Sequence, residues 1–352
     1  MQNLSWRRWI PHPAERAKQN ALIIPMRQLG SSSLHITVVG LGSWAFGKNG
    51  WGRQRDDDSI ATIRHAVSAG INWIDTAAIY GLGHSEEIIA NALAGMSAAD
   101  RPHVFTKVGV SWDPSSQVTR HVLDPVVIRR ELDASLRRLQ VDCVDLYQVH
   151  KPPRDDCTPL EVYWQTMADL KAAGKVRLIG LSNHDVAMLD RAERIAHVDS
   201  LQPPLSVINR LAAAEIAWAA EHGTGVIVYS PLQSGLLTGE FTAERAANLP
   251  ADDWRRAHRD FTSDLIANLA LADRLGPIAR RHGVPVSAVA VAWTLAWPGV
   301  TGAIVGARHP DQLLGWLSAT RLHLAEEDQS EIAAAILATR AGSGPPGFAT
   351  CE

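Results

Sequence analysis

Four polar side chains that follow apolar segments could together carry proton-transfer chemistry: Asp75, Tyr80, Lys107 and His150. If they meet, an Asp75–Lys107 ion pair keeps both groups charged, and a cation near Tyr80 would lower its pKa below the usual value of about 10. Such a phenol could protonate an oxygen that gains negative charge, and His150 could donate a hydrogen bond to the same oxygen. The residues alone fit equally well a structural ion pair beside a core tyrosine and a satisfied histidine.

The elements that would position these residues repeat as strand and helix. A helix near 58–69 stops at Gly70, and after the next strand another helix begins at Ser85, with Glu86 and Glu87 in its first turn. Asp124 and Pro125 are the expected cap and first residue of a further helix. Short apolar runs predict buried strands at 38–41, 72–75, 104–107, 144–150, 176–181, around 201, at 226–229 and at 302–306. Helices are expected near 125–139, 159–173, 185–196, 212–222, 286–297, 310–319 and 326–340.

Eight buried strands that alternate with helices predict a (β/α)8 TIM barrel in a single domain. We place this domain at 26–340; it begins with a small hairpin of 26–29 with 35–37, and extra C-terminal helices complete it. Residues 1–25 are an N-terminal extension and residues 341–352 a C-terminal tail. The competing fold is an open dinucleotide-binding sheet, because residues 40–45 fit a GxGxxA fingerprint after a strand. That fingerprint requires a helix immediately afterwards, whereas a glycine-rich loop follows here.

In a closed parallel barrel the carboxyl ends of the strands meet at one mouth, where active sites are built. One strand that ends in a polar residue means little, but a succession of them favours a lined pocket. The polar residues at these ends are Asp75, Lys107, His150, Ser182, Asn183, Gln202, Tyr229, Ser230 and Arg308.

Composition limits the partners. The 352 residues carry a net charge of −3, so nothing favours a nucleic-acid or anionic-membrane partner. Cys143, Cys157 and Cys351 are an odd number without CxxC or CxxH spacing, so we expect no disulfide framework and a reducing, cytoplasmic location. Residues 283–307 carry no charge, but proline and glycine interrupt them, so we expect a buried helix and strand and not a membrane span.

Asp75, the run Tyr80-Gly81-x-Gly83-x-Ser85-Glu86, Lys107 and His150 resemble the catalytic tetrad of the aldo-keto reductases. The similarity extends in order through Gly180-Leu181-Ser182-Asn183, Tyr229-Ser230-Pro231-Leu232, Gly235-Leu236-Leu237 and Gly306-Ala307-Arg308-x-Pro310-x-Gln312. It covers about residues 26–320.

The resemblance implies a barrel enzyme that reduces an aldehyde or ketone to an alcohol with NADPH and without a metal, NADH being less favoured. Tyr80 would be the proton donor, Asp75 and Lys107 would tune it, and His150 would orient the carbonyl. Arg308 would meet the 2′-phosphate of NADP, because a planar guanidinium suits phosphate oxygens. The other implied cofactor contacts are Ser182, Asn183 and Gln202 at the carboxamide, Tyr229 stacked on the nicotinamide, and Ser230, Pro231, Leu232, Gly235, Leu237, Gly306 and Gln312 along the remaining cofactor path.

Some positions depart from the family pattern. Trp316 stands where many members carry an asparagine that contacts adenine, and Gln202-Pro203-Pro204 replaces a frequent Gln-x-x-Tyr-Asn. Trp44 and Trp112 follow strands and could wall a substrate pocket, or could equally be core or surface residues.

A regulatory or redox-sensing subunit on the same fold is the alternative function, one that binds NADP(H) with little turnover. The full tetrad favours catalysis on a small carbonyl or alcohol substrate. The sequence leaves the oligomeric state open.

Overall fold

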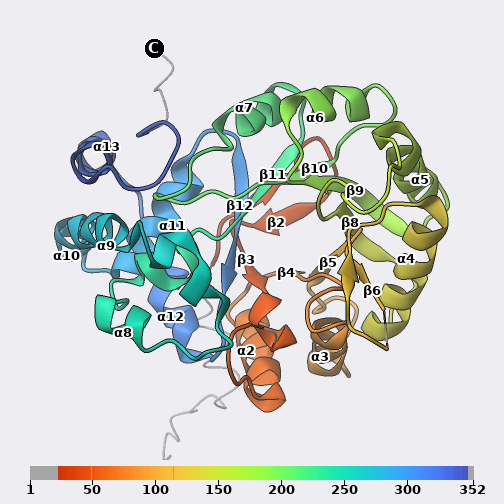
Figure 1. The fold of residues 1–352 in the computed structure, drawn as a ribbon, viewed down its shortest axis with the longest axis horizontal. Helices are drawn as coiled ribbons and strands as arrows, with labels where there is room; N and C mark the ends of the chain where they lie inside the picture. Colours follow the sequence, from red (N-terminus) through yellow and green to blue (C-terminus); the bar gives the residue numbers. More distant parts are fainter. Residues whose placement is uncertain (1–22, 49, 114, 348–352) are drawn as a thin grey trace, which may run out of the picture.

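Within residues 23–48, 50–113 and 115–347, which the computed structural model describes, eight parallel strands form a closed barrel (Figure 1). Each strand pairs with its neighbour in the chain order, and β12 pairs with β3 to close the barrel. The TIM barrel prediction is therefore confirmed. The barrel strands are β3 (Val39–Gly42), β4 (Trp73–Asp75), β5 (His103–Val108), β8 (Val144–Val149), β9 (Val176–Ser182), β10 (Ser200–Gln202), β11 (Gly225–Tyr229) and β12 (Val300–Gly306).

Helices surround the strands as an outer ring (Figure 1). All the helices expected from the sequence are present, with ends displaced by a few residues. They are α2 (Asp56–Ser68), α3 (His84–Leu93), α4 (Pro125–Leu139), α5 (Leu160–Ala172), α6 (Val186–Glu193), α7 (Ala213–Glu221), α11 (Val286–Ala296), α12 (Asp311–Leu317) and α13 (Glu326–Thr339).

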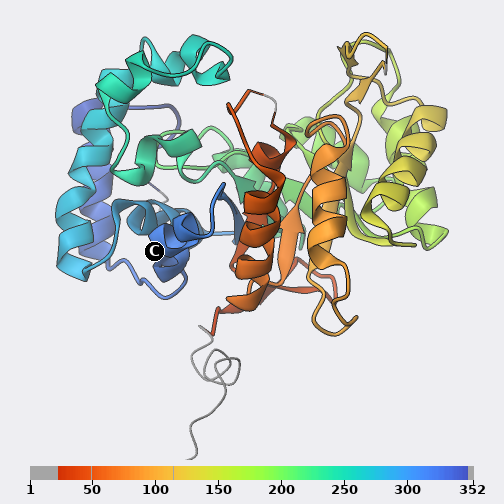
Figure 2. The ribbon, with the colours of Figure 1, turned by 90° about the horizontal axis from the view of Figure 1, so that it is seen from below.

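The sequence pattern did not predict the bounds of several further elements. A hairpin of β6 (Ser111–Trp112) with β7 (Thr119–Arg120) follows β5, and a long insertion follows β11. Figure 2 shows the hairpin and the insertion above the same end of the barrel. The insertion contains η2 (Gln233–Thr238), α8 (Ala243–Ala247), η3 (Trp254–Ala257), η4 (Arg259–Phe261), α9 (Leu265–Arg274) and α10 (Gly276–His282); a short η1 (Trp44–Gly47) follows β3, and η5 (Ser318–Thr320) follows α12.

The helices α4 and α3 begin in different ways. Asp124 caps α4 as expected, its side chain accepting a hydrogen bond from the Val126 N–H, and Pro125 is the first residue. The expected start at Ser85 is wrong, because α3 begins at His84 after Gly83 in a left-handed conformation with φ of 101°. The Ser85 hydroxyl is instead used in a buried contact between loops.

The predicted hairpin, β1 (Met26–Gln28) with β2 (His35–Thr37), closes the end of the barrel opposite the carboxyl ends of its strands. Trp73 lies inside the barrel against Phe105 and donates its indole N–H to the Thr37 carbonyl. A Cβ on Gly40 would lie 2.2 Å from the Trp73 ring, so packing against tryptophan explains this glycine. The dinucleotide fingerprint at 40–45 is thus accidental, because its last residues belong to the short 3-10 helix η1 and no α-helix follows directly.

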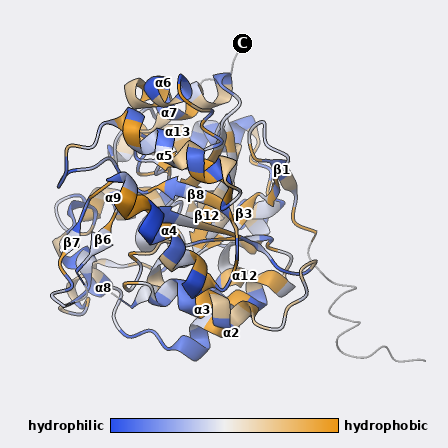
Figure 3. Ribbon diagram, turned by 90° about the vertical axis from the view of Figure 1, so that its right-hand side faces the viewer, coloured by the Kyte–Doolittle hydropathy of each residue, from blue (hydrophilic) through white to orange (hydrophobic). Residues whose placement is uncertain are grey.

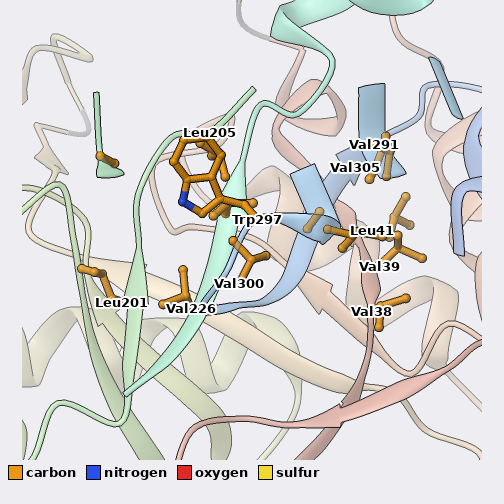
Figure 4. Close-up of a cluster of buried hydrophobic side chains, with 14 of the residues drawn as sticks. Val38, Val39, Leu41, Leu201, Leu205, Val226, Val291, Trp297, Val300 and Val305 are labelled. Carbon is orange, nitrogen blue, oxygen red and sulfur yellow. The ribbon is translucent and has the colours of Figure 1, made fainter. Parts of the chain in front are cut away.

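The main core lies between the barrel strands and the helices. Valine and leucine side chains of β3, β10, β11 and β12 lie together with residues of α11 (Figure 4). Hydrophilic and hydrophobic segments alternate along the peripheral helices (Figure 3). The uncharged stretch predicted to be buried forms α11 and β12, as expected, and no helix of the described residues is long and apolar enough to cross a membrane.

Both ends of the sequence lie partly outside the described residues. Of the N-terminal extension only 23–25 are described, and Cys351 also falls outside; Cys143 and Cys157 are free thiols. Residues 341–347 run beside buried Arg210, whose Nε donates to the Pro345 carbonyl at 2.7 Å. This described part of the C-terminal tail is therefore attached to the barrel.

Candidate active site

The four residues that could carry proton transfer meet at the carboxyl end of the barrel. Lys107 Nζ lies 2.5 Å from Asp75 Oδ1, and both side chains are almost completely buried. The same nitrogen lies 3.5 Å from the Tyr80 hydroxyl and donates to the Thr76 carbonyl at 2.9 Å. The Tyr80 and His150 rings are 5.8 Å apart, edge to face. A phenol, an ammonium, a carboxylate and an imidazole thus surround one position.

The protonation states differ from the sequence expectation for one residue. Burial, and secondarily the Asp75 carboxylate, raise the pKa of Tyr80 well above its usual value, so the expected lowering by Lys107 is wrong. The reason is geometric, because the ammonium is nearer to Asp75 than to the phenol and its charge is largely offset there. Burial and the Lys107 charge lower the pKa of His150 well below its usual value. Tyr80 therefore stays protonated and His150 neutral.

Burial also acts on the ion pair itself. It raises the pKa of Asp75 and lowers the pKa of Lys107, while the charge of each partner and their hydrogen bond oppose these shifts. The second oxygen of Asp75 accepts a hydrogen bond of 2.8 Å from the Gln202 amide. Gln202 thus supports the ion pair, a role that sequence reasoning did not assign to it.

A second hydrogen-bonded group lies beside the tetrad. The Asn183 side-chain N–H donates to the His150 carbonyl and to Ser182 Oγ, both at 2.9 Å, and its oxygen accepts from the Tyr229 hydroxyl at 2.8 Å. Asn183 has φ of 60°, a left-handed conformation that asparagine tolerates better than most residues. These contacts fix the Tyr229 ring at the cavity wall.

Close backbone packing holds the Tyr80 loop. A Cβ on Gly47 would lie 2.5 Å from the Gly81 nitrogen and 2.6 Å from the Tyr80 carbonyl carbon. Ser85 Oγ contacts Thr76 Oγ1 at 3.0 Å and donates to Ser43 Oγ at 2.9 Å. The loops after β3 and β4 are thus locked together beneath the phenol.

A cavity of about 1320 Å³ opens beside these groups. Trp112 and Leu237 are outside its described lining; the Trp112 ring lies 5.7 Å from the Arg138 guanidinium, and Leu237 is fully buried. Lys107 is also outside this lining, whereas its partner Asp75 belongs to it. The predicted site residues that do line it are Trp44, Asp75, Tyr80, His150, Ser182, Asn183, Gln202, Tyr229, Ser230, Pro231, Leu232, Gly235, Gly306, Arg308 and Gln312.

Arg308 is held at the cavity by Gln54, which the sequence did not single out, and by Gln312, which it did. Its Nε donates to Gln54 Oε1 at 2.9 Å, and the Gln54 amide donates back to the Arg308 carbonyl at 2.8 Å. Gln312 Oε1 accepts from the Arg308 backbone N–H at 2.7 Å. Trp316 also lines the cavity, and its buried indole N–H has no partner among the described residues.

An aromatic wall, formed by Trp44, Trp51 and Trp254, faces Tyr80. The Trp44 ring stacks on Trp254 at 5.6 Å between centroids, meets Trp51 edge-on at 5.0 Å, and lies 6.3 Å from the Tyr80 ring. Sequence reasoning missed Trp254, because it comes from the insertion after β11 and no local pattern places that insertion over the loop after β3.

Comparisons with known proteins agree with this geometry. Residues 38–337 match the Aldo/keto reductase family. The chain is 35% identical over 307 residues to Aldo-keto reductase YhdN of Bacillus subtilis (strain 168), which covers 86% of this chain and 91% of that protein. It is 30% identical over 316 residues to the NADH-specific methylglyoxal reductase of Escherichia coli (strain K12), which covers 85% and 94%.

Among solved structures, the chain is similar to the glycerol dehydrogenase AKR11B4 from Gluconobacter oxydans, with a TM-score of 0.82 and 33% identity. The similarity covers 92% of this chain and 99% of that chain. This chain therefore belongs to the aldo-keto reductase family, whose members are oxidoreductases that use nicotinamide cofactors.

Proposed function

We propose that the protein reduces a small aldehyde or ketone to an alcohol, with NADPH as the hydride donor and Tyr80 as the proton donor. The observation that carries this proposal is the meeting of Tyr80, Lys107 and Asp75 beside His150 at the wall of one large cavity. A structural ion pair alone would not need a protonated phenol and a neutral imidazole facing open space.

The chain's own groups account for the proton. The raised pKa of Tyr80 keeps its hydroxyl protonated, so that it can donate to a carbonyl oxygen as negative charge develops there. Neutral His150 donates one hydrogen bond to the same oxygen and orients the carbonyl. Lys107, held by Asp75 and the Thr76 carbonyl, lies 3.5 Å from the Tyr80 oxygen and would donate a hydrogen bond to the phenolate that remains, although Asp75 offsets much of its charge.

The residues around the cavity fit a dinucleotide. The volume exceeds what a small carbonyl compound needs, and no heavy atom lies within 4 Å of a Cβ built on Gly306, which leaves room for a ligand against the backbone. Ser182, Asn183 and Gln202 would hold the carboxamide, and Tyr229 would stack on the nicotinamide. Ser230, Pro231, Leu232 and Gly235 would follow the pyrophosphate. A nicotinamide held by these residues would supply a hydride for the carbonyl carbon.

Arg308 supports a preference for NADPH. Its guanidinium is only half-buried and pairs with no carboxylate in the described residues, so it can take a 2′-phosphate. Gln54 fixes its orientation from one side. One relative, from Escherichia coli, is an NADH-specific enzyme. The preference of this protein for NADPH over NADH therefore has to be measured directly.

The test is Tyr80→Phe, assayed by NADPH oxidation with an aromatic aldehyde and by NADPH binding. Loss of a general acid costs about 10²–10⁴ in rate, whereas binding should change little because the hydroxyl acts on the substrate oxygen. Wild-type turnover in this variant would remove Tyr80 from the mechanism. Binding of NADPH without turnover in the wild-type protein would favour the regulatory alternative.

A further inference from the structure

A cluster of positive charge lies next to the proposed reaction centre. Lys151 directly follows His150 and lines the same cavity. Within the described residues its ammonium has no hydrogen bond and no carboxylate partner; burial, and after it the charge of Arg154, lower its pKa. Lys151 is exposed to solvent where it lines the cavity, so an anion in the cavity could contact its ammonium without displacing a protein partner.

The neighbours of Lys151 add to this charge. The Arg154 guanidinium donates to His121 Nε2 at 2.7 Å, so His121 is neutral and carries its proton on Nδ1. Burial, then Arg154 and Lys151, lower the pKa of His121, which agrees with that state. His121 lines the cavity and is 9% exposed, and its Nδ1–H has no partner in the described part of the chain.

The carboxylates closest in sequence are committed elsewhere. Asp155 Oδ2 accepts a hydrogen bond from the His121 backbone N–H at 2.5 Å. The negative charge of Asp155 offsets the positive charge of the cluster only in part. Asp156 Oδ2 accepts from the Leu123 N–H at 2.9 Å and from Thr158 Oγ1 at 3.0 Å. These bonds attach the segment after β8 to the end of the β6–β7 hairpin. They leave Lys151 and Arg154 as cations without an ion pair among the described residues.

We propose that Lys151, backed by His121, is a subsite for an anionic group of the substrate, a carboxylate or a phosphate. The substrates of the proposed reductase, on whose function this inference rests, are then small aldehydes or ketones that also carry such a group. Lys151 and His150 line the same cavity, and the Lys151 charge is, after burial and the Lys107 charge, one of the causes that lower the pKa of His150, so one ligand could contact both side chains. His150 orients the carbonyl while Lys151 binds the charged end.

Two matched substrate pairs test the subsite: succinic semialdehyde against butanal, and glyceraldehyde 3-phosphate against glyceraldehyde. The measured quantity is the ratio of kcat/KM for the anionic to the neutral member of each pair. Lys151→Met should lower this ratio about tenfold or more, the value of one hydrogen bond to a charged group, and Lys151→Arg should retain most of it. The pair with the larger loss identifies carboxylate or phosphate as the preferred group.

Lys175→Met is the matched control, because Lys175 pairs with Asp133 in a half-exposed ion pair and does not line the cavity. It should leave both ratios unchanged. Equal ratios in wild type and Lys151→Met, for both pairs, would overturn the subsite while turnover of the neutral substrates left the proposed function standing.

Binding separates the subsite from catalysis. In the Tyr80→Phe background, quenching of tryptophan fluorescence reports ligand in the cavity, which Trp44, Trp51 and Trp254 line. Succinate should bind about tenfold more weakly when Lys151→Met is added. This result would support the subsite even if wild-type protein reduced no carbonyl and the proposed function failed; equal succinate binding with and without Lys151 would refute it.

Discussion

Removal of Lys107 should destabilise the fold because it leaves a buried carboxylate without its cation. The side chains of Lys107 and Asp75 are 1% and 4% exposed, and their charged atoms are 2.5 Å apart. When one partner of a buried ion pair is lost, the cost is about 3–5 kcal/mol. We expect Lys107→Met to lower the free energy of unfolding by an amount in this range, and to lower kcat as well.

A second lysine–aspartate ion pair, which is exposed where the first is buried, provides the control. Lys175 lies 2.6 Å from Asp133, but these side chains are 45% and 44% exposed. Solvent screens such a pair, so Lys175→Met should cost at most about 1 kcal/mol. Urea unfolding of both variants measures the difference. Equal losses would refute the argument that burial determines the value of the Asp75–Lys107 pair.

The pH dependence of Lys107→Met follows from linkage. Burial already raises the pKa of Asp75, and loss of the cation raises the folded-state pKa further above that of the unfolded chain. The folded state then binds more protons, so the deficit relative to wild type is smallest below about pH 4 and grows as pH rises to the folded pKa. Adding Asp75→Asn should recover part of the loss. A deficit that did not change with pH would show that Asp75 does not remain the uncompensated group.

Three further predictions concern activity. Because the pKa of Tyr80 is raised, reduction rates should stay constant from about pH 6 to about pH 9, whereas the rate of alcohol oxidation, which needs the phenolate, should rise with pH. Initial rates measured in both directions test this. A reduction rate that fell near neutral pH would contradict it. Arg308→Ala should raise Kd for NADPH by about tenfold or more and leave that for NADH nearly unchanged; an equal rise for both, by titration, would mean that Arg308 does not contact the phosphate. Gly47→Ala should lower kcat by about 10²-fold, because its Cβ would displace the backbone at Tyr80 and Gly81; wild-type kcat with an unchanged melting temperature would show that this packing does not position the phenol.

Local patterns in the sequence determined the architecture. The apolar runs, the glycines after helices and the Asp124-Pro125 cap are properties of adjacent residues, so the strand and helix alternation of the barrel followed directly from them. The positions of Asp75, Lys107 and His150 also followed, because the carboxyl ends of parallel strands converge at one mouth. Sequence patterns further identified Arg308 and the residues around Asn183 as cavity residues.

Only the tertiary structure decided the charge states and the walls of the site. The pKa of Tyr80 depends on whether Lys107 is nearer to the phenol or to Asp75 and on how much water remains, and neither distance nor burial is encoded in spacing. The Trp44–Trp254 stack joins residues 210 positions apart in sequence, and His121 meets Arg154 from a different loop. Such contacts depend on how loops without a repeating pattern fold over the barrel, so their chemistry appears only when the chain is packed.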